Sequence, residues 1–565
     1  MRWVFQKHIP SNIFQNLTNI PEVVAQILYN RGISGQKTME EFLEPDYDEG
    51  IHDPFLFRDM EKAVARIQKA IRDKEKIVAH GDYDADGVCG AAVLVDGLRQ
   101  LGAQVEAYLP HREREGYGVN KETVKQLAKN GTNLIITADC GISNQPEIEL
   151  ARELGMDVIV TDHHHEPLQM PTAAYAIINP SVSTETYPFR GLAGVGVAFK
   201  LISALYQKDN GKTVPKGAEK WLLDLVAIST ITDMMPLLGE NRVLVKYGLI
   251  VLRKTRRFGL HALAQAVNTP IEKFDTDHIG FRIGPRLNAA GRLQHADIAF
   301  QAMITKSAGE AQKLAQRLEQ INNDRRLVTE LISTEVEQQL GEVAPEQKAL
   351  FAFGNNWPIG VVGLVAGKVA QKYNRPVFIL GEVDGNIVAS GRSVPELNIV
   401  EVLQASAKYY AKYGGHAAAC GFTLKYKEDF DEWKQFMHDL IKEKLDGADT
   451  TQMLKVESEI RLTDITWELW QFLEKLAPFG QAHPKPVYAA RQVTVQQVKA
   501  LGKTGKHLRL VVEQGGMTKQ SVGFGFGEWS QKLSPGQKID IAFTVDLNEW
   551  NGQRELQLKI LDIHV

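Results

Sequence analysis

Carboxylate and imidazole side chains follow three short apolar runs of this sequence, each at the point where the run ends. The segment HGDYDADG occupies residues 80–87, Asp139 lies in ADCG, and DHHH occupies residues 162–165. A fourth carboxylate, Asp233, closes an apolar helical segment. Because the carboxyl ends of parallel strands converge at one edge of an open α/β sheet, we expect these side chains to meet in one site.

These residue types predict a site for two divalent metal ions. Oxygen ligands mixed with a few imidazoles, and without a thiolate, favour Mn²⁺ or Mg²⁺ over zinc. The six carboxylates of these segments would repel one another unless cations neutralised them. Two ions roughly 3.5 to 4 Å apart can clamp both the attacking and the leaving oxygen of a phosphoester. The predicted reaction is therefore metal-assisted phosphoester hydrolysis.

Simpler interpretations exist for single parts of this pattern. D-x-D-x-D-G also begins an EF-hand calcium loop, but the twelfth position is Val93 instead of Glu, and a strand precedes the segment. Asp139 alone could cap a following helix, and Asp233 could be a surface residue at a helix end. The joint placement at several strand ends favours the shared metal site.

The elements that must position this site are typical of an α/β domain. Strands are predicted at residues 77–79, 105–109, 134–137, 158–161 and 174–178. Helical segments lie between most of them, which indicates βαβ units and a doubly wound parallel sheet.

The rest of the chain predicts three further parts. Residues 310–340 contain neither Gly nor Pro, and Ser307 with Glu310 forms a capping-box pattern, so we expect a long helix bridging two domains. Runs after it predict a second α/β domain, and Gly-rich turns between later strands predict a small, OB-like β-barrel. The expected parts are an N-terminal cap at 1–55, a catalytic domain at 56–305, the bridging helix at 306–342, the second α/β domain at 343–452 and the barrel at 453–565.

Composition excludes several classes of protein. The 565 residues include 65 Lys plus Arg and 69 Asp plus Glu, a formal net charge of −4, which excludes a histone-like polycation but not local basic patches. No apolar run reaches the roughly 18 residues of a membrane-spanning helix, and the N-terminus MRWVFQKHIP lacks the apolar core of a signal peptide. Three scattered cysteines exclude a disulfide framework. We expect a cytoplasmic protein without membrane contact.

The barrel segment predicts a nucleic-acid-binding surface. Residues 475–512 carry seven Lys or Arg and no Asp or Glu. OB-folds bind single strands with a basic groove and stacked aromatic side chains. The predicted phosphate contacts are Lys503, Lys506 and Arg509. The stacking candidates are Tyr488, Phe524 and Phe526, although alternating Gly and Phe also suits a packed strand.

The motifs resemble those of the DHH phosphoesterase superfamily in order and spacing, over essentially the whole chain. They are HGDYDADG, ADCG, TDHHH and TITDMMPL, and GGHAAACGF at residues 414–422 is similar to the signature of the DHH-associated C-terminal domain. The resemblance implies a single-strand-specific 5′→3′ DNA exonuclease that acts in recombination and repair and uses two Mn²⁺ or Mg²⁺ ions.

The resemblance also implies roles for individual residues. One metal would lie on His80, Asp84 and Asp139, and the other on Asp86, Asp139, His163 and Asp233. Asp82 and Asp162 would support these ligands or replace one of them, and His164 would face the scissile phosphate as a charge stabiliser or proton donor. The predicted substrate contacts are Arg112, Arg286, Ser390, Arg392, Gly414, Gly415 and His416. Any single arginine among them could instead form a surface salt bridge.

Two other functions stay open. A DHH phosphodiesterase for oligonucleotides or dinucleotides would share the two-metal site but would not need a basic barrel. A non-catalytic scaffold that binds single strands during replication would not need so many metal ligands. The exonuclease interpretation implies single-stranded DNA as substrate, with a helicase and a single-strand-binding protein as partners.

Overall fold

The chain divides into two compact units in a computed structural model, which describes all residues except 113, 384, 450, 503 and 551. The first unit combines Met1–His52, Met234–Tyr247 and Gln452–Val565, and the second combines Asp53–Asp233 with Gly248–Thr451. Each unit therefore assembles segments that are distant in the sequence.

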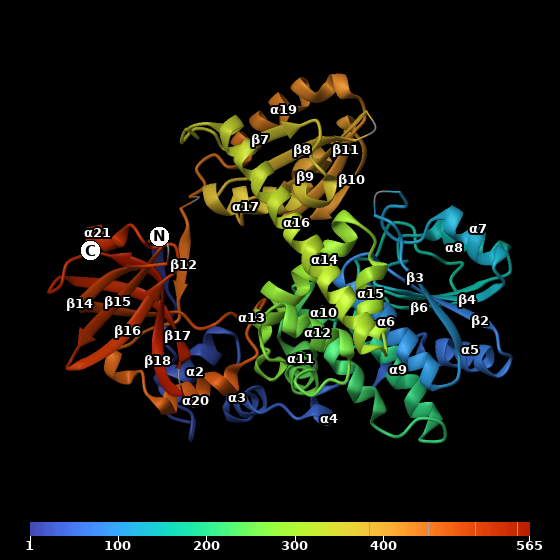
Figure 1. Cartoon of the computed structure of the whole chain (residues 1–565), viewed down its shortest axis with the longest axis horizontal. Coiled ribbons are helices and arrows are strands. Elements are labelled where there is room, and N and C mark those ends of the chain that lie inside the picture. Colours follow the sequence, from blue (N-terminus) through green and yellow to red (C-terminus); the bar gives the residue numbers. More distant parts are fainter. Residues whose placement is uncertain (113, 384, 450, 503, 551) are drawn as a thin grey trace. The chain divides into compact units, whose positions relative to one another are not determined.

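A five-stranded parallel sheet forms one end of the second unit (Figure 1). Its strands lie in the order β3 (Gln104–Tyr108), β2 (Lys76–Gly81), β4 (Thr132–Ala138), β5 (Asp157–Thr161) and β6 (Ala176–Ile178). Helices α7 (Lys121–Lys129) and α8 (Gln145–Glu153) cover one face, and α6 (Ala85–Gln100) and α9 (Gly194–Asp209) cover the other. The predicted doubly wound sheet is confirmed. The strand order reverses between β2 and β4, the place where such sheets bind ligands.

The predicted long helix is α16 (Ala308–Leu340). The Ser307 hydroxyl accepts a hydrogen bond from the Glu310 amide, but the Glu310 carboxylate bonds Thr305 instead of closing the capping box. The first half of α16 packs on α12 (Phe258–Ala266), α14 (Gly284–Leu293) and α15 (Asp297–Ile304), and its second half packs on α17 (Ile359–Tyr373) and β7 (Leu350–Gly354). Within the described residues, neither this helix nor any other is long and apolar enough to cross a membrane.

A mixed sheet follows α16 in the same unit. Its order is β10 (Tyr410–His416), β11 (Ala419–Leu424), β9 (Asn386–Arg392), β8 (Val377–Val383) and β7. Strands β7 and β8 are parallel, as a second α/β domain requires, and the later strands pair antiparallel. Helices α18 (Ile399–Ala405) and α19 (Phe430–Lys444) cover it, with Trp433 of α19 fully buried.

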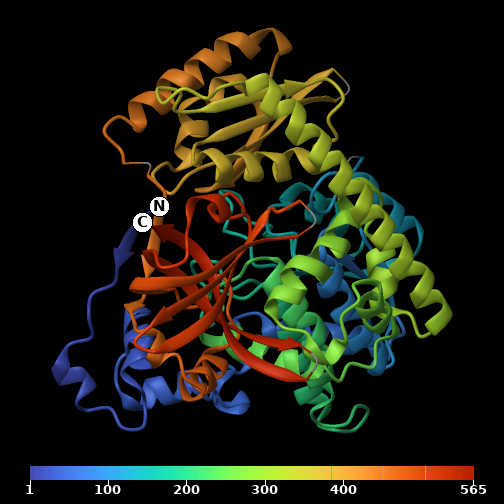
Figure 2. The ribbon, with the colours of Figure 1, turned by 60° about the vertical axis from the view of Figure 1, so that its left-hand side comes forward.

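The first unit contains the predicted barrel, drawn in red in Figure 2. Its strands are β14 (Tyr488–Leu501), β15 (His507–Gln514), β16 (Met517–Gly523), β18 (Gln553–His564) and β17 (Lys538–Trp550). Pairing of β14 with β17 closes this five-stranded ring, which confirms the OB-like barrel.

The N-terminal residues share a hydrophobic core with the barrel instead of forming a core of their own. Buried residues of α2 (Glu22–Asn30) pack with those of the barrel, and β1 (Arg2–Phe5) pairs with β12 (Met453–Val456). A segment of about 50 residues is usually too short for an independent core.

The segment that joins this unit from the middle of the chain is the start of α11 (Gly239–Leu252). The buried Arg242 guanidinium donates to the carbonyl oxygens of Lys475, Leu476 and Ala477, at the end of α20 (Trp467–Leu476). A cation at the last carbonyls of a helix satisfies acceptors that lack a partner within the helix.

Candidate metal centre and nucleic-acid contacts

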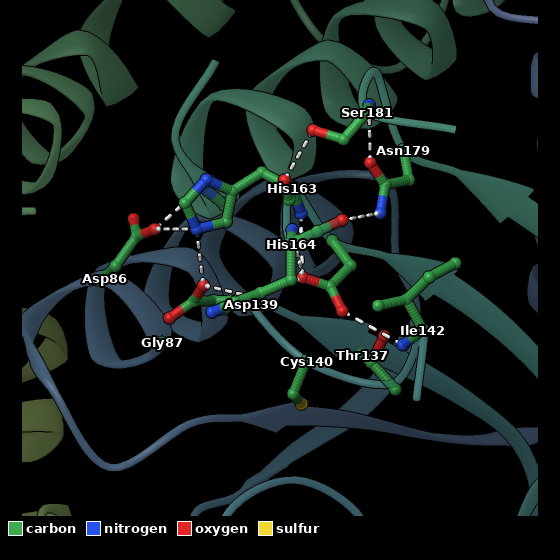
Figure 3. Close-up of polar contacts among 12 residues, drawn as sticks. Asp86, Gly87, Thr137, Asp139, Cys140, Ile142, His163, His164, Asn179 and Ser181 are labelled. Carbon is green, nitrogen blue, oxygen red and sulfur yellow. Dashed lines mark hydrogen bonds and ion pairs between the residues drawn. The ribbon is translucent and has the colours of Figure 1, made fainter. Parts of the chain in front are cut away.

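The carboxyl ends of three parallel strands bring the predicted ligands together (Figure 3). The His163 Nε2 atom, after β5, lies 3.1 Å from Asp139 Oδ1, after β4. The same nitrogen lies 3.7 Å from Asp86 Oδ2 and 3.7 Å from Asp233 Oδ2. Asp233 comes from the end of α10 (Leu223–Thr232), so helices and strands supply ligands to one point.

Three groups of these side chains could each hold a metal ion. In every group the ligand atoms lie within 4.8 Å of one another. The groups are Asp82 with Asp84 and Asp139, Asp86 with His163 and Asp233, and Asp139 with His163 and His164. Asp139 belongs to two of them, which is the geometry a bridging ligand needs.

Several polar atoms of this centre are buried without a hydrogen-bond partner among the described residues. They are His80 Nε2, Asp82 Oδ1, Asp139 Oδ1 and Asp233 Oδ2. Such atoms are costly to bury unless a cation or a donor satisfies them. The donor set of carboxylates and imidazoles suits a divalent ion of the Mn²⁺ or Mg²⁺ class. The residues present therefore fit the implied metal ions.

The electrostatics of the centre agree with this fit. Burial raises the pKa of Asp139 well above its ordinary range, and the charges of Asp86 and Asp84 raise it further. Burial and like charges also raise the pKa values of Asp82 and Asp233. Burial lowers the pKa of His80 to about 4, which keeps its imidazole in the neutral form that binds metals.

Local backbone geometry tests whether Asp139 and Asp84 are helix caps. Asp139 has a left-handed backbone conformation with φ of 64° and caps no helix. Non-glycine residues in that region are uncommon and concentrate at functional sites. Asp84 does cap α6, because its Oδ1 accepts from the amides of Asp86 and Gly87, while it also faces the other carboxylates.

Asp162 is fully occupied by donors and orients the histidines after it. Its carboxylate accepts from the amides of Ile142, His163 and His164 and lies 2.8 Å from His164 Nδ1. Burial would raise the pKa of Asp162, but the hydrogen bond and charge interaction with His164 lead the effects that lower it below its ordinary value. Asp162 is therefore placed to hold the metal-ligand candidates in position.

His164 is more exposed than His163, and polar contacts fix its ring. Its side chain is 35% exposed, against 12% for His163. Its Nδ1 also lies 3.0 Å from the hydroxyl of Tyr117, which donates to the Asp139 carbonyl oxygen. Burial would lower the pKa of His164, but Asp162 outweighs this and raises it above its ordinary value. A more readily protonated imidazole with Nδ1 engaged suits charge stabilisation at its other nitrogen.

The sequence analysis did not identify several residues that support the histidine segment at residues 162–165. Asn179 donates to the His164 carbonyl oxygen at 2.9 Å, and Ser181 donates to that of His163 at 2.7 Å (Figure 3). Asn179 directly follows β6 and Ser181 lies two residues further on, so the rule that strand ends carry polar residues could have found them. Tyr117 lies in a loop and offered no comparable signal.

The predicted substrate contacts of the second unit differ in their surroundings. The Arg112 guanidinium lies over the Tyr83 ring at 4.9 Å. Arg392 Nη1 donates to Ser390 Oγ at 3.0 Å, and both residues lie on β9. Arg286 forms an ion pair with Glu319 and so adopts the salt-bridge alternative in this structure. The roles of all these residues in phosphate binding stay predictions.

The GGH segment lies near the metal centre within the same unit. Gly414, Gly415 and His416 are exposed at the end of β10. The ring of His416 lies 5.6 Å from that of His165, the histidine next to His164. Burial lowers the pKa of His416, and the charges of nearby histidines lower it further.

Barrel strands align several basic residues on one exposed side. Across β14, β15, β16 and β18, the register places Lys499 opposite Arg509, Arg509 opposite Val522, and Val522 opposite Lys559. Lys506 and Arg509 are exposed, and Lys503 lies outside the described residues. Phe524 is 58% exposed, with the Lys559 ammonium 5.6 Å from its ring.

Other members of the basic segment differ from the prediction. Tyr488 is fully buried in the barrel core and cannot stack on a base, and Phe526 packs against the same core. Lys485 and Arg491 form ion pairs with Asp546 and Asp540 of β17. Lys475 lies in α20, outside the barrel, and pairs with Glu44. The acids that neutralise these residues come from distant parts of the chain.

Comparisons with known proteins agree with this architecture. Three family models match: the DHH family N-terminal domain at residues 76–230, the DHHA1 domain at 346–443 and the RecJ OB domain at 456–562. The chain is 35% identical to the single-stranded-DNA-specific exonuclease RecJ of Bacillus subtilis over 570 residues, which covers 100% of this chain and 71% of that protein. It is 32% identical to the Escherichia coli protein of the same name, with 96% of each chain covered.

Solved structures show the same likeness. The crystal structure of RecJ from Thermus thermophilus in complex with Mn²⁺ matches with a TM-score of 0.85 at 28% identity, covering 100% of this chain and 79% of that one. The Mg²⁺ complex from the same organism matches with a TM-score of 0.79 at 26% identity, covering 100% and 78%.

Proposed function

The chain belongs to the RecJ family of the DHH phosphoesterases, and from this membership we propose that it is a single-stranded-DNA-specific exonuclease that hydrolyses phosphodiester bonds. The observation that carries the proposal is the convergence of Asp82, Asp139, His163 and Asp233 at one edge of the sheet, where buried carboxylate oxygens have no hydrogen-bond partner among the described residues. Neither a phosphate-binding module nor a structural carboxylate cluster would require so many buried acids at one point.

The proposed ligand sets follow the sequence interpretation. One ion would be held by His80, Asp84 and Asp139, and the other by Asp86, Asp139, His163 and Asp233. Two bound divalent ions supply an activated water and stabilise the charge that develops on the phosphate oxygens. The protein's own part is to orient the ligands through Asp162 and to present His164 to the scissile phosphate.

The DNA strand is proposed to run from the metal centre past the phosphate contacts of the second unit. Arg112, Ser390, Arg392 and the GGH segment would bind its phosphates, because guanidinium groups and backbone amides suit phosphate oxygens. We assign 5′→3′ polarity and a role in recombination and repair from the family. A helicase and a single-strand-binding protein are proposed partners, and a cytoplasmic location follows from the DNA substrate.

Digestion of end-labelled DNA tests the proposed function. We expect rapid release of a mononucleotide from 5′-labelled single strands with Mn²⁺ or Mg²⁺, slow digestion of blunt duplex, and no digestion in EDTA. Strands labelled at the 3′ end should release their label last. Equal digestion in EDTA would contradict the metal mechanism, and a preference for dinucleotides over long strands would contradict the exonuclease assignment.

Replacing Lys506 and Arg509 with Ala should weaken binding of single-stranded DNA and flatten its salt dependence. Each phosphate contact with a single strand contributes about 0.7 to the slope of log K against log salt, so loss of two contacts should lower the slope by about 1.4. Binding of a labelled oligonucleotide at several salt concentrations, with EDTA to prevent cleavage, measures this slope.

The double variant Lys475→Ala/Lys485→Ala is the matched control, because both lysines already pair with carboxylates. It removes the same amount of charge and should leave the salt slope near that of the parent. If both double variants change the slope equally, the strand does not contact the exposed side that carries Arg509.

A further inference from the structure

The Asp86 carboxylate is surrounded by three hydrogen-bond donors that no predicted role explains. The Gly194 amide donates to Oδ2 at 2.7 Å, and the Val195 amide donates to Oδ1 at 3.0 Å. The Ser229 hydroxyl also donates to Oδ1. Asp86 and Ser229 are both buried, at 1% and 0% exposure. These donors come from the first turn of α9 and from the middle of α10.

Ser229 behaves differently from other serines within helices of this protein. A helical serine commonly bonds the carbonyl four residues before it, as Ser203 does with Phe199 at 2.8 Å and Ser333 with Thr329 at 2.6 Å. The Ser229 hydroxyl instead crosses from α10 to a carboxylate on α6. Within this mostly apolar helix, the Ser229 hydroxyl has a specific partner on another helix.

The close approach of α9 to the metal centre depends on Gly194. A Cβ atom added there would lie 2.6 Å from Asp139 Cβ and 2.9 Å from Asp86 Oδ2. The start of the helix thus lies against two of the proposed ligands, with its free amides directed at Asp86. The positive end of a helix dipole also stabilises a carboxylate at that position.

We propose that Ser229, together with the Gly194 and Val195 amides, is a positioning group for Asp86. The three donors hold the carboxylate in one orientation, in which Oδ2 lies 3.7 Å from His163 Nε2 and takes part in the group with Asp233. The hydroxyl thereby sets the affinity of that metal position without contacting substrate. This inference rests on the proposed role of Asp86 as a metal ligand.

Mn²⁺ binding to the full chain, measured by electron paramagnetic resonance of free Mn²⁺ without DNA, tests the inference. Loss of a group that orients a metal ligand typically costs about 10- to 100-fold in metal affinity. Ser229→Ala should therefore weaken the binding of one of the two Mn²⁺ ions by about that factor. Ser203→Ala, the matched serine on α9, should bind Mn²⁺ like the parent.

A second pair of variants separates the effect of the Ser229 hydroxyl on Mn²⁺ binding from the effect of side-chain packing. Ser229→Thr and Ser229→Val have nearly the same shape, so any packing damage is common to both, but Thr alone keeps the donor. Thr should bind Mn²⁺ more tightly than Val by about the same 10- to 100-fold. Equal affinities of this pair would overturn the inference.

Asp86→Asn distinguishes this failure from failure of the proposed site. If Asp86→Asn weakens Mn²⁺ binding while the Ser229 variants do not, Asp86 is a ligand and only the role of Ser229 is wrong. If Asp86→Asn binds both ions like the parent, the proposed ligand set and the role of Ser229 are both wrong.

Discussion

Asp139→Ala is expected to lower the rate of single-stranded DNA hydrolysis by on the order of 1,000-fold or more. Asp139 belongs to two of the three metal-binding groups, so its loss disturbs both ions at once. Metal ions contribute several kcal/mol of transition-state stabilisation, and each 1.4 kcal/mol corresponds to about tenfold in rate. Initial rates on 5′-labelled oligonucleotides at saturating Mn²⁺ measure the effect.

The thermal stability of Asp139→Ala tests whether its loss of activity is caused by unfolding. Burial and the neighbouring carboxylates raise the pKa of Asp139, so in metal-free protein its ionised form destabilises the fold, increasingly as pH rises through the ordinary range of a carboxyl group. Without metal at pH 8, Asp139→Ala should melt at a higher temperature than the parent. Asp297→Ala, an exposed acid on α15, is the activity control. Retained activity of Asp139→Ala would mean that the centre lies elsewhere.

The metal ligands could be predicted from the sequence because they follow a local rule: polar residues directly follow the carboxyl ends of the strands. Asp82, Asp139 and Asp162 each come directly after a buried strand of a parallel sheet, His163 follows Asp162, and such strand ends must converge. The apolar runs identified the strands because both faces of this sheet are covered by helices, which leaves few polar residues in them.

Arg491 and Tyr488 show what local sequence does not reveal about the barrel. Arg491 lies in a segment without any acid, yet Asp540 of β17 neutralises it, because β14 pairs with β17 across the closure of the barrel. Tyr488 is a stacking candidate by sequence but is fully buried, because strand alternation alone does not say which face of a strand lines the core. Both outcomes depend on contacts between residues far apart in the chain.

Ser229 and Gly194 illustrate the same limit in the metal centre. Neither residue lies at a strand end, and a serine within an apolar helix usually satisfies itself locally. Only the packing of α9 and α10 against α6 places them at Asp86. Ligands were therefore readable from local sequence, whereas the groups that orient them were not.

His164→Ala is expected to lower kcat by about 10²- to 10⁴-fold while leaving Mn²⁺ binding close to that of the parent. The Nδ1 atom of His164 is engaged by Asp162 and Tyr117, and lies 3.7 Å from Asp139 Oδ1, so its exposed ring is better placed for the phosphate than for a metal. His163→Ala should instead weaken Mn²⁺ binding, because the His163 Nε2 atom lies within 3.7 Å of three carboxylates. Single-turnover rates together with Mn²⁺ titrations separate the two effects, with His438→Ala, a half-buried histidine of α19, as the control. Equal loss of Mn²⁺ affinity in both variants would assign His164 to the metal ions, as the group of Asp139, His163 and His164 allows, and would leave the phosphate without its proposed partner.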